Sequence, residues 1–171
     1  RQMPLVPAEV WQQITVRGLV SAGLTLQSAP DEPMFRASLS FRQADLRFPA
    51  LDLQLANATG VLNIEDTVAT IHDLHGVVAG GEIRAEGHVD LSSNPAPMDI
   101  SIELRELAVQ RLPSTWGIPE GITGKVSGAA ELEMRFDNGG IHATGIGKAT
   151  VQQAALDGVP IEPVQIQLRP T

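Results

Sequence analysis

The sequence predicts a mainly β fold of long antiparallel strands, and three observations lead to this prediction. Residues 122–136 place every even-numbered side chain, all apolar or small, on one face of a strand about 50 Å long. Similar alternation recurs along most of the chain, between turns rich in Gly, Pro, Asn and Asp. The two arms of one predicted hairpin also match residue by residue. A β-sandwich or a β-solenoid is the alternative architecture.

Composition excludes several classes of function. The 171 residues are 43% hydrophobic, carry a net charge of −8 and contain no cysteine. Disulfides and thiolate chemistry are therefore excluded, and the scattered Lys and Arg residues argue against nucleic-acid binding. No apolar run is long enough to cross a membrane as a helix. Because the sequence begins without an initiator Met, we expect a single fragment of a larger repeat protein, with membrane contact through parts outside it.

The first part of the chain is expected to form one helix and two strands. Residues 6–14 have Val, Trp and Ile at helical spacing after a proline, which predicts a short helix around Trp11. Residues 16–27 alternate as a strand. Residues 35–48 also alternate, but their phase changes near Gln43, which predicts a β-bulge there.

The middle of the chain continues the strand pattern. Residues 51–55 and 60–64 each alternate, and we interpret them as two strands around a turn at residues 57–60. Residues 68–74 form a further strand, and a Gly-Gly turn precedes a clean alternation over residues 82–91.

The last part of the chain is expected to add a second helix and a long hairpin. Residues 98–104 alternate as a strand, and residues 107–116 predict a second short helix that contains a tryptophan and is broken by a proline. Residues 122–136 and 141–151 form the arms of the hairpin, and residues 163–169 form a final strand.

The turn at residues 137–140 sets a register that can be compared with the pattern. If Phe136 faces Ile141, opposite residues are apolar or small along one whole face, and a slip by one residue would mix the two faces. The predicted pairs on that face are Met134 with Ala143, Leu132 with Gly145, Ala130 with Gly147, Gly128 with Ala149 and Val126 with Val151.

The sequence also contains an internal repeat. Residues 18–26, GLVSAGLTL, are similar to residues 124–132, GKVSGAAEL, and a Pro–Trp segment precedes each. These matches predict a first repeat copy at about residues 6–105 and a truncated second copy at about residues 112–171. Stacked repeats of this kind bury a continuous apolar surface.

These features together resemble the AsmA-like (TamB-like) superfamily. The resemblance rests on a Pro–Trp helix, then long Gly-punctuated strands, then a Gly-Gly hairpin such as GVVAGGEIRAEGHVDL at residues 76–91. It implies a curled, open, groove-like sheet in the periplasmic part of an inner-membrane-anchored envelope protein of Gram-negative bacteria. The implied function needs no cofactor and is not enzymatic: the groove carries phospholipid between the inner and outer membranes and supports outer-membrane homeostasis.

An apolar face on such a sheet would keep acyl chains out of water, with a gain of about 0.8 kcal/mol per buried methylene. Small residues such as Gly128 and Gly147 would leave room for a lipid or allow tight curvature. The residues expected to line the groove are Val126, Leu132, Met134, Phe136, Ile141 and Val151 in the hairpin, and Ile83, Val89, Leu91, Ile100 and Ile102 before it.

A second interpretation assigns the same face to ordinary packing. In it the two Trp segments or another sheet cover the apolar residues, and exposed strand edges or loops bind an envelope protein partner. The two interpretations differ in whether the apolar face meets lipid or protein.

Patterns that suggest catalytic or metal sites are not supported by their spacing. His72 and His75 stand three residues apart, so in a regular strand they point to opposite faces, and no third ligand is nearby. Glu131 and Glu133 share the polar face and are expected to be solvated charges rather than an acid pair. We therefore expect no catalytic residue, no metal site and no enzyme activity.

Overall fold

The protein folds as a single antiparallel sheet. The computed structural model describes residues 15–28, 33–93, 96–137 and 140–169. The helix expected at residues 6–14 lies outside this part of the chain. The strands are β1 (Thr15–Ser28), β2 (Pro33–Phe48), β3 (Leu53–Glu65), β4 (Val68–Val78), β5 (Gly81–Asp90), β6 (Pro97–Ala108), β7 (Ile122–Asp137), β8 (Gly140–Leu156), β9 (Val159–Pro160) and β10 (Val164–Leu168).

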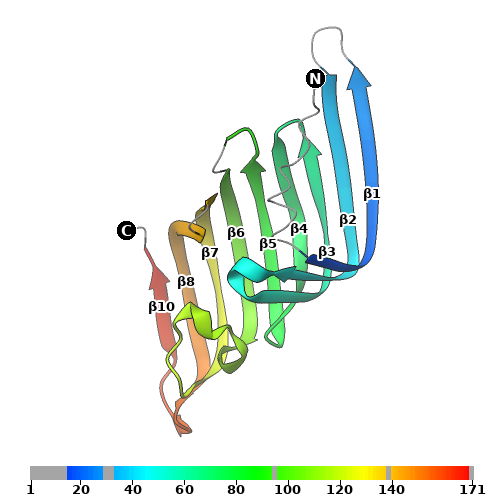
Figure 1. The fold of residues 1–171 in the computed structure, drawn as a ribbon. Coiled ribbons are helices and arrows are strands. Elements are labelled where there is room, and N and C mark those ends of the chain that lie inside the picture. The colour runs from blue at the N-terminus through cyan, green and yellow to red at the C-terminus, as the bar shows by residue number, and fades with distance from the viewer. Residues whose placement is uncertain (1–14, 29–32, 94–95, 138–139, 170–171) are drawn as a thin grey trace.

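Strands that follow each other in sequence are also neighbours in the sheet. The described strands form one ten-stranded sheet in the order β1-β2-β3-β4-β5-β6-β7-β8-β10, with β9 paired to β8. The sheet is open and curved, and β1 and β10 lie at its two edges (Figure 1). The prediction of a mainly β, open antiparallel sheet is confirmed, and neither a second sheet nor a solenoid is found among these strands.

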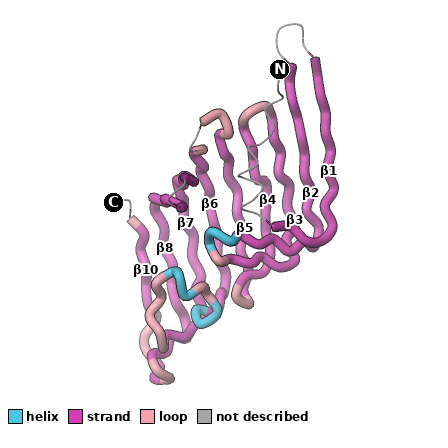
Figure 2. Tube along the Cα trace, viewed as in Figure 1, coloured by secondary structure: helices cyan, strands magenta, loops and turns pink. Residues whose placement is uncertain are grey.

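Helical structure in the described residues is limited to short 3₁₀ turns (Figure 2). They are η1 (Pro49–Leu51), η2 (Val109–Arg111) and η3 (Ser114–Trp116). The second helix predicted from residues 107–116 is therefore wrong. Leu107 belongs to β6, and Leu112 is extended (φ −73°, ψ 153°) because Pro113 follows it and disfavours helical backbone.

The register predicted for the long hairpin is confirmed. Phe136 pairs with Ile141, and the matching continues without a slip as far as Val126 with Val151. On the polar face Glu133 pairs with Thr144, as the same register requires. On the opposite face each pair joins apolar or small residues, which explains why this register is the stable one.

A row of bulges crosses the sheet. A bulge inserts one residue and so reverses the alternation of the strand that follows it. The prediction of a bulge near Gln43 is confirmed, because the β2–β3 register shifts there. The described non-glycine residues at such points have positive φ: Gln43 (51°) in β2, Asn57 (53°) in β3, Asp73 (47°) in β4, Glu106 (52°) in β6 and Gln153 (52°) in β8.

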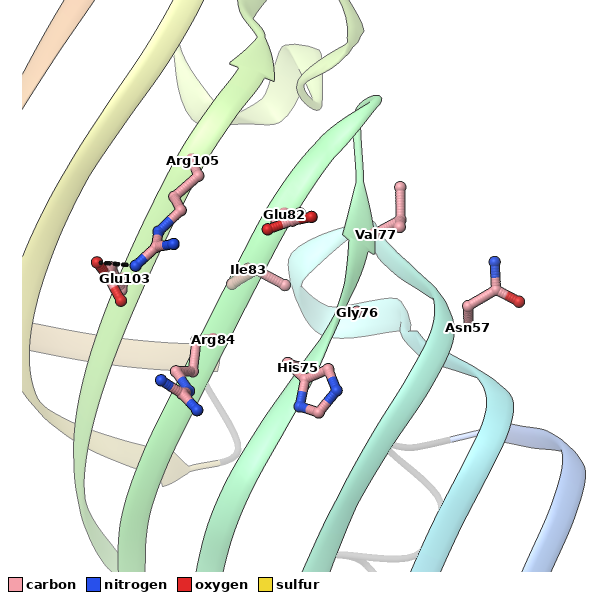
Figure 3. A pocket seen from close by; sticks show the side chains of 9 residues that line it. All are labelled: Asn57, His75, Gly76, Val77, Glu82, Ile83, Arg84, Glu103 and Arg105. Atoms are coloured by element: carbon pink, nitrogen blue, oxygen red, sulfur yellow. Dashed lines mark hydrogen bonds and ion pairs between the residues drawn. The ribbon is translucent and has the colours of Figure 1, made fainter.

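Two of these bulges correct the sequence interpretation. Asn57 does not begin a turn: residues 51–55 and 60–64 belong mainly to one strand, β3, whose alternation reverses at the bulge. The bulge at Asp73 likewise places His72 and His75 on the same polar face. His72 directly follows Ile71, which lies on the apolar face, and His75 pairs with Arg84 on the polar face. Figure 3 shows His75 and Arg84 on this side of the sheet.

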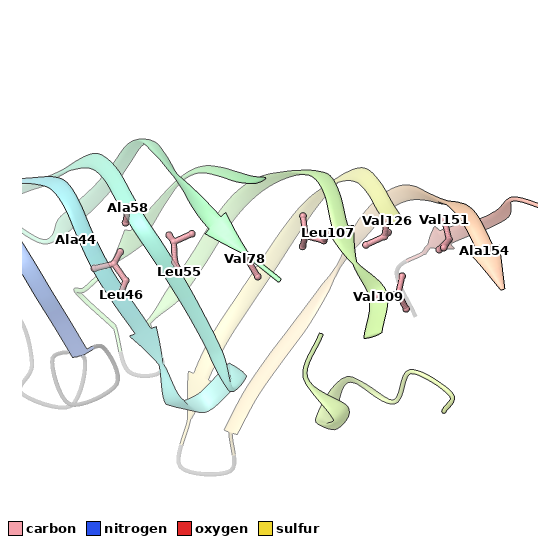
Figure 4. Packing of buried hydrophobic residues seen from close by; sticks show 10 residues of the cluster. All are labelled: Ala44, Leu46, Leu55, Ala58, Val78, Leu107, Val109, Val126, Val151 and Ala154. Atoms are coloured by element: carbon pink, nitrogen blue, oxygen red, sulfur yellow. The ribbon is translucent and has the colours of Figure 1, made fainter. Parts of the chain in front are cut away.

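The main buried core lies where the strands bend. We call it the corner cluster, and Figure 4 shows its side chains on the same side of the sheet. The segment after β6 packs against it through Leu112 and Ile118. The Trp116 indole Nε1–H donates a hydrogen bond to the Leu51 carbonyl (3.1 Å), which joins η3 to η1. The buried members are Ala44, Leu46, Leu55, Ala58, Val78, Leu107, Val109, Val126, Val151 and Ala154.

Candidate functional site

The candidate site is the apolar face of the sheet beyond the corner cluster. Residues opposite each other in an antiparallel pair share a face, so a row of neighbours can be followed through the register from strand to strand. One such line, the central row, crosses from β1 to β8 through apolar and small residues alone. Its members are Ala22, Leu39, Leu62, Ile71, Gly87, Ile100, Leu132 and Gly145.

The central row is more accessible than the rows on either side. None of its members is fully buried. Toward the bend lies the corner cluster, and toward the other end lies a smaller cluster of Ile64, Ala69 and Val89. At a strand spacing of about 4.8 Å, the row extends roughly 34 Å across the sheet. The described residues therefore present a continuous apolar strip with buried clusters on both sides.

The predicted lining residues fall into different parts of this face. Leu132 and Ile100 lie in the central row, and Ile102 is half-buried beside it, opposite Ala130. Met134 is 8% exposed and pairs with Met98 in the next row. The side chains of Phe136 and Ile141 lie outside the described part, although their backbones are paired. Val126 and Val151 belong to the corner cluster, and Ile83 packs against that cluster. Val89 belongs to the smaller cluster, and Leu91 packs against the smaller cluster.

Sequence reasoning missed the part of the central row that comes from β2, β3 and β4. Leu39, Leu62 and Ile71 pair in succession across these strands. Their alternation is visible in the sequence, but the supposed turn at Asn57 separated strands that in fact form one continuous face. The alternation does change phase at Asn57, but Asn favours turns as well as bulges, so this local signal did not decide between them.

The small residues of the face serve close backbone approach rather than an empty channel. A Cβ at Gly147 would lie 2.8 Å from the Cβ of Ala130, and one at Gly128 would lie 2.6 Å from the Cβ of Ala149. Real Cβ atoms essentially never come so close. Of the two roles expected for these glycines, the structure favours tight curvature.

The opposite face is polar, and ion pairs connect its strands. Arg84 on β5 contacts Asp73 on β4 (2.6 Å between Nη2 and Oδ1). Arg36 with Glu65 and Lys125 with Glu106 likewise join adjacent strands at 3.5 and 2.9 Å, and His88 Nε2 lies 3.0 Å from the Asp99 carboxylate of the next strand. All these side chains are about half or more exposed, so each pair contributes little to stability. These charged side chains identify this face as the one that meets water.

A shallow hollow of about 380 Å³ lies mainly on this polar face (Figure 3). Its charges are balanced, because Arg105 contacts Glu103 (3.0 Å) and Arg84 contacts Asp73. The hydrogen bond from Arg84 to Asp73, aided by the charge of that carboxylate, raises the pKa of Arg84. The hollow therefore offers no concentrated charge for an ionic ligand. Its lining residues are Asn57, His75, Gly76, Val77, Glu82, Ile83, Arg84, Glu103 and Arg105.

A second titratable group with a shifted pKa is Asp90, at the end of β5. The pKa of Asp90 is lowered because the side chain and backbone of Ser92 donate hydrogen bonds to its carboxylate. This is a turn contact at the end of β5. Although His72 and His75 share a face, the described residues contain no group of three or more side chains suited to hold a metal ion.

Comparison with known families identifies the chain. The sequence model of the AsmA family matches residues 15–135, which covers β1 to almost the end of β7. The chain belongs to the AsmA family. No curated protein and no solved structure matches it. Within the described residues of this AsmA-family chain, no helix is long and apolar enough to cross a membrane.

Proposed function

We propose that this AsmA-family chain is a non-enzymatic lipid-handling module that carries phospholipid acyl chains along its apolar face. The observation that carries the proposal is the central row. It combines continuous apolar character from β1 to β8 with incomplete burial of every member. A partly exposed, contiguous apolar strip of this kind supports an interaction site.

The energetics suit a mobile ligand. Covering about ten methylenes of an acyl chain would gain roughly 8 kcal/mol before the entropy of ordering is subtracted. The gain is non-directional, since it follows the area removed from water. Because the central row contains no charged or hydrogen-bonding side chain, nothing in it fixes a head group at one position. An acyl chain can therefore shift along the row at little cost while its head group stays in water.

We place this activity in the periplasm, between the inner and outer membranes, in support of outer-membrane homeostasis. The proposal rests on family membership and on the resemblance of the repeat pattern to envelope proteins of this kind. Contact with the membranes would come through parts of the protein outside these residues, including an inner-membrane anchor. Other envelope proteins are the expected partners.

A paired substitution on β7 tests the proposal. Leu132 lies in the central row, whereas the adjacent Glu131 is exposed on the polar face. We expect Leu132→Arg to lower uptake of a fluorescent fatty acid about tenfold or more, because an unpaired charge in the acyl-chain path costs well over 1.4 kcal/mol. Glu131→Arg, which changes the charge on the other face, should leave uptake within about twofold.

Two further measurements complete the test. Native mass spectrometry of the purified chain should detect bound phospholipid, and thermal unfolding should show both variants folded. Absence of both bound lipid and fatty-acid uptake in the unsubstituted chain would overturn the proposal. Unfolding caused by Leu132→Arg would instead indicate a sealed core, and the chain would then act as a structural or protein-binding repeat.

A further inference from the structure

The hairpins β1–β2 and β7–β8 have the same geometry at matching positions. In the first, Gly18 (φ 128°) lies opposite the bulge residue Gln43 (φ 51°). In the second, Gly124 (φ 143°) lies beside the bulge residue Gln153 (φ 52°). Counting from these glycines, β1 corresponds to β7 residue by residue, and β2 corresponds to β8.

The two hairpins differ in their neighbours. β7 lies between β6 and β8, whereas among the described strands β1 pairs with β2 alone (Figure 1). Val126 on β7 is 7% exposed, but Val20, at the matching position of β1, is 42% exposed. Leu24 is 64% exposed, whereas its counterpart Ala130 is half-buried. The apolar residues of β1 thus lack the cover that β6 and the segment after it give to β7.

A hydrogen bond joins the bulge of β6 to β7. Glu106 is the bulge residue of β6, and its backbone N–H donates to the Ser127 hydroxyl at 2.9 Å. Ser21 stands at the matching position of β1, directly after Val20, and is exposed. β1 therefore carries the same acceptor for a bulged neighbour that β7 uses.

We propose that the edge of β1 binds one additional antiparallel strand of the β6 type, supplied by another repeat unit of the AsmA-family kind. Its bulge residue donates its backbone N–H to the Ser21 hydroxyl. The β6–β7 register fixes the alignment: the residue equivalent to Ile102 faces Leu24, and the one equivalent to Leu107 faces Val20. This interaction extends the apolar face beyond β1 and does not depend on whether lipid binds there.

The partner strand has a defined chemistry. It alternates, with apolar side chains toward the face that carries Val20 and Leu24, and it contains one positive-φ residue at the bulge. Lys125 on β7 makes an ion pair with Glu106 at 2.9 Å, but β1 has Leu19 at the matching position, 71% exposed. The partner of β1 therefore has no need of an acidic bulge residue. Among the described strands, β1 has a neighbour on one side only, and its other edge, with Arg17 as the single charge of the strand, is suited to strand addition.

Disulfide crosslinking to a synthetic β6 peptide tests the proposal, because the chain has no cysteine of its own. The peptide is residues 97–108, PMDISIELRELA. Leu24→Cys should crosslink to a peptide with Ile102→Cys, and Thr25→Cys to a peptide with Ser101→Cys, because these pairs share a face in the proposed register. Thr25→Cys with the Ile102→Cys peptide, on opposite faces, is the matched control and should not crosslink.

Two peptide experiments separate strand addition from non-specific apolar contact. N-methylation of alternate peptide residues should abolish binding for one parity and leave it unchanged for the other, because only one edge of an added strand pairs with β1. Ser21→Ala should weaken binding about two- to tenfold, the loss expected for one hydrogen bond. Equal binding by both methylated peptides would overturn the proposal. So would crosslinking of the Ile102→Cys peptide to Leu168→Cys on β10 but not to Leu24→Cys on β1. An unchanged affinity of Ser21→Ala would refute the role of its hydroxyl.

Discussion

Leu107 is the largest fully buried side chain in the described core, with 1% of its surface exposed. It follows the Glu106 bulge in β6, pairs with Val126 of β7 and lies in the corner cluster beneath the segment that carries η3. The bend of the sheet and the cover over it therefore meet at this residue. Truncation of its side chain is the most direct test of what stabilises the fold.

Leu107→Ala removes apolar contacts and leaves a cavity that the rigid strands around it cannot fill. Substitutions of this kind cost about 2–5 kcal/mol. For a chain of this length each kcal/mol corresponds to about 2–4 °C in Tm, so we expect a decrease of about 4–20 °C. The free energy of unfolding should change through the urea midpoint, with an unchanged m-value.

Urea denaturation followed by circular dichroism measures this loss. Leu19→Ala is the matched control, because Leu19 is 71% exposed and its truncation should change the free energy of unfolding by no more than about 0.5 kcal/mol. If Leu107→Ala costs less than about 1 kcal/mol, or no more than the control, the corner cluster is not the stabilising core and the reasoning is refuted.

Three further changes have defined outcomes. Gly124→Ala should destabilise the chain by about 1–3 kcal/mol in urea denaturation, because the glycine has φ +143° and the new Cβ would lie 2.8 Å from a Val151 methyl; a neutral result would contradict this. Trp116→Phe should cost about 0.5–1.5 kcal/mol by losing the indole hydrogen bond to η1, and an unchanged urea midpoint would argue against that contact. Ser92→Ala should raise the pKa of Asp90 toward its ordinary value in an NMR titration. Because the native pKa is lowered, the contribution of Asp90 to stability is present at neutral pH and disappears as pH falls through that pKa. Ser92→Ala should reduce this acid sensitivity without removing it, because the backbone N–H of residue 92 still donates to the carboxylate.

The long hairpin could be predicted from sequence because two local signals agree. The alternation of residues 122–136 and the turn after them fix one register, and any slip would put charged residues among apolar ones. The bulge at Gln43 was predictable because the alternation changes phase within a run that otherwise reads as one strand.

The bulge at Asn57 was missed because its residue type also favours turns, whereas the bulge at Asp73 was missed because the pattern of residues 68–74 predicts one strand without a bulge. Asn and Asp tolerate positive φ in both settings, so a local pattern does not distinguish a bulge inside a strand from a turn between two strands. Pairing with neighbouring strands decides the outcome, since β3 continues past Asn57 along both β2 and β4. The helix predicted at residues 107–116 failed because tertiary packing decides this segment too: Leu107 at the end of β6 and Val109 in η2 are buried together in the corner cluster.

The candidate face was predictable in kind but not in extent. Sequence identified Leu132, Ile100 and Ile102 on an apolar face, and the register joins Leu132 and Ile100 to one row. It did not reveal that the bend would enclose Val126 and Val151, because that enclosure depends on the segment after β6 folding back over the sheet. Local alternation identifies a face, whereas tertiary packing decides which part of it stays accessible.

Photo-crosslinking along β7 tests the central claim most directly. A photoreactive side chain is placed in turn at each of positions 129–134, and the chain is exposed to phospholipid vesicles and illuminated. If the apolar face carries acyl chains, lipid adducts should form at positions 130, 132 and 134, most strongly at Leu132, and should be weak at positions 129, 131 and 133. Adducts without this two-residue period, or adducts mainly at Glu131 and Glu133, would contradict the account.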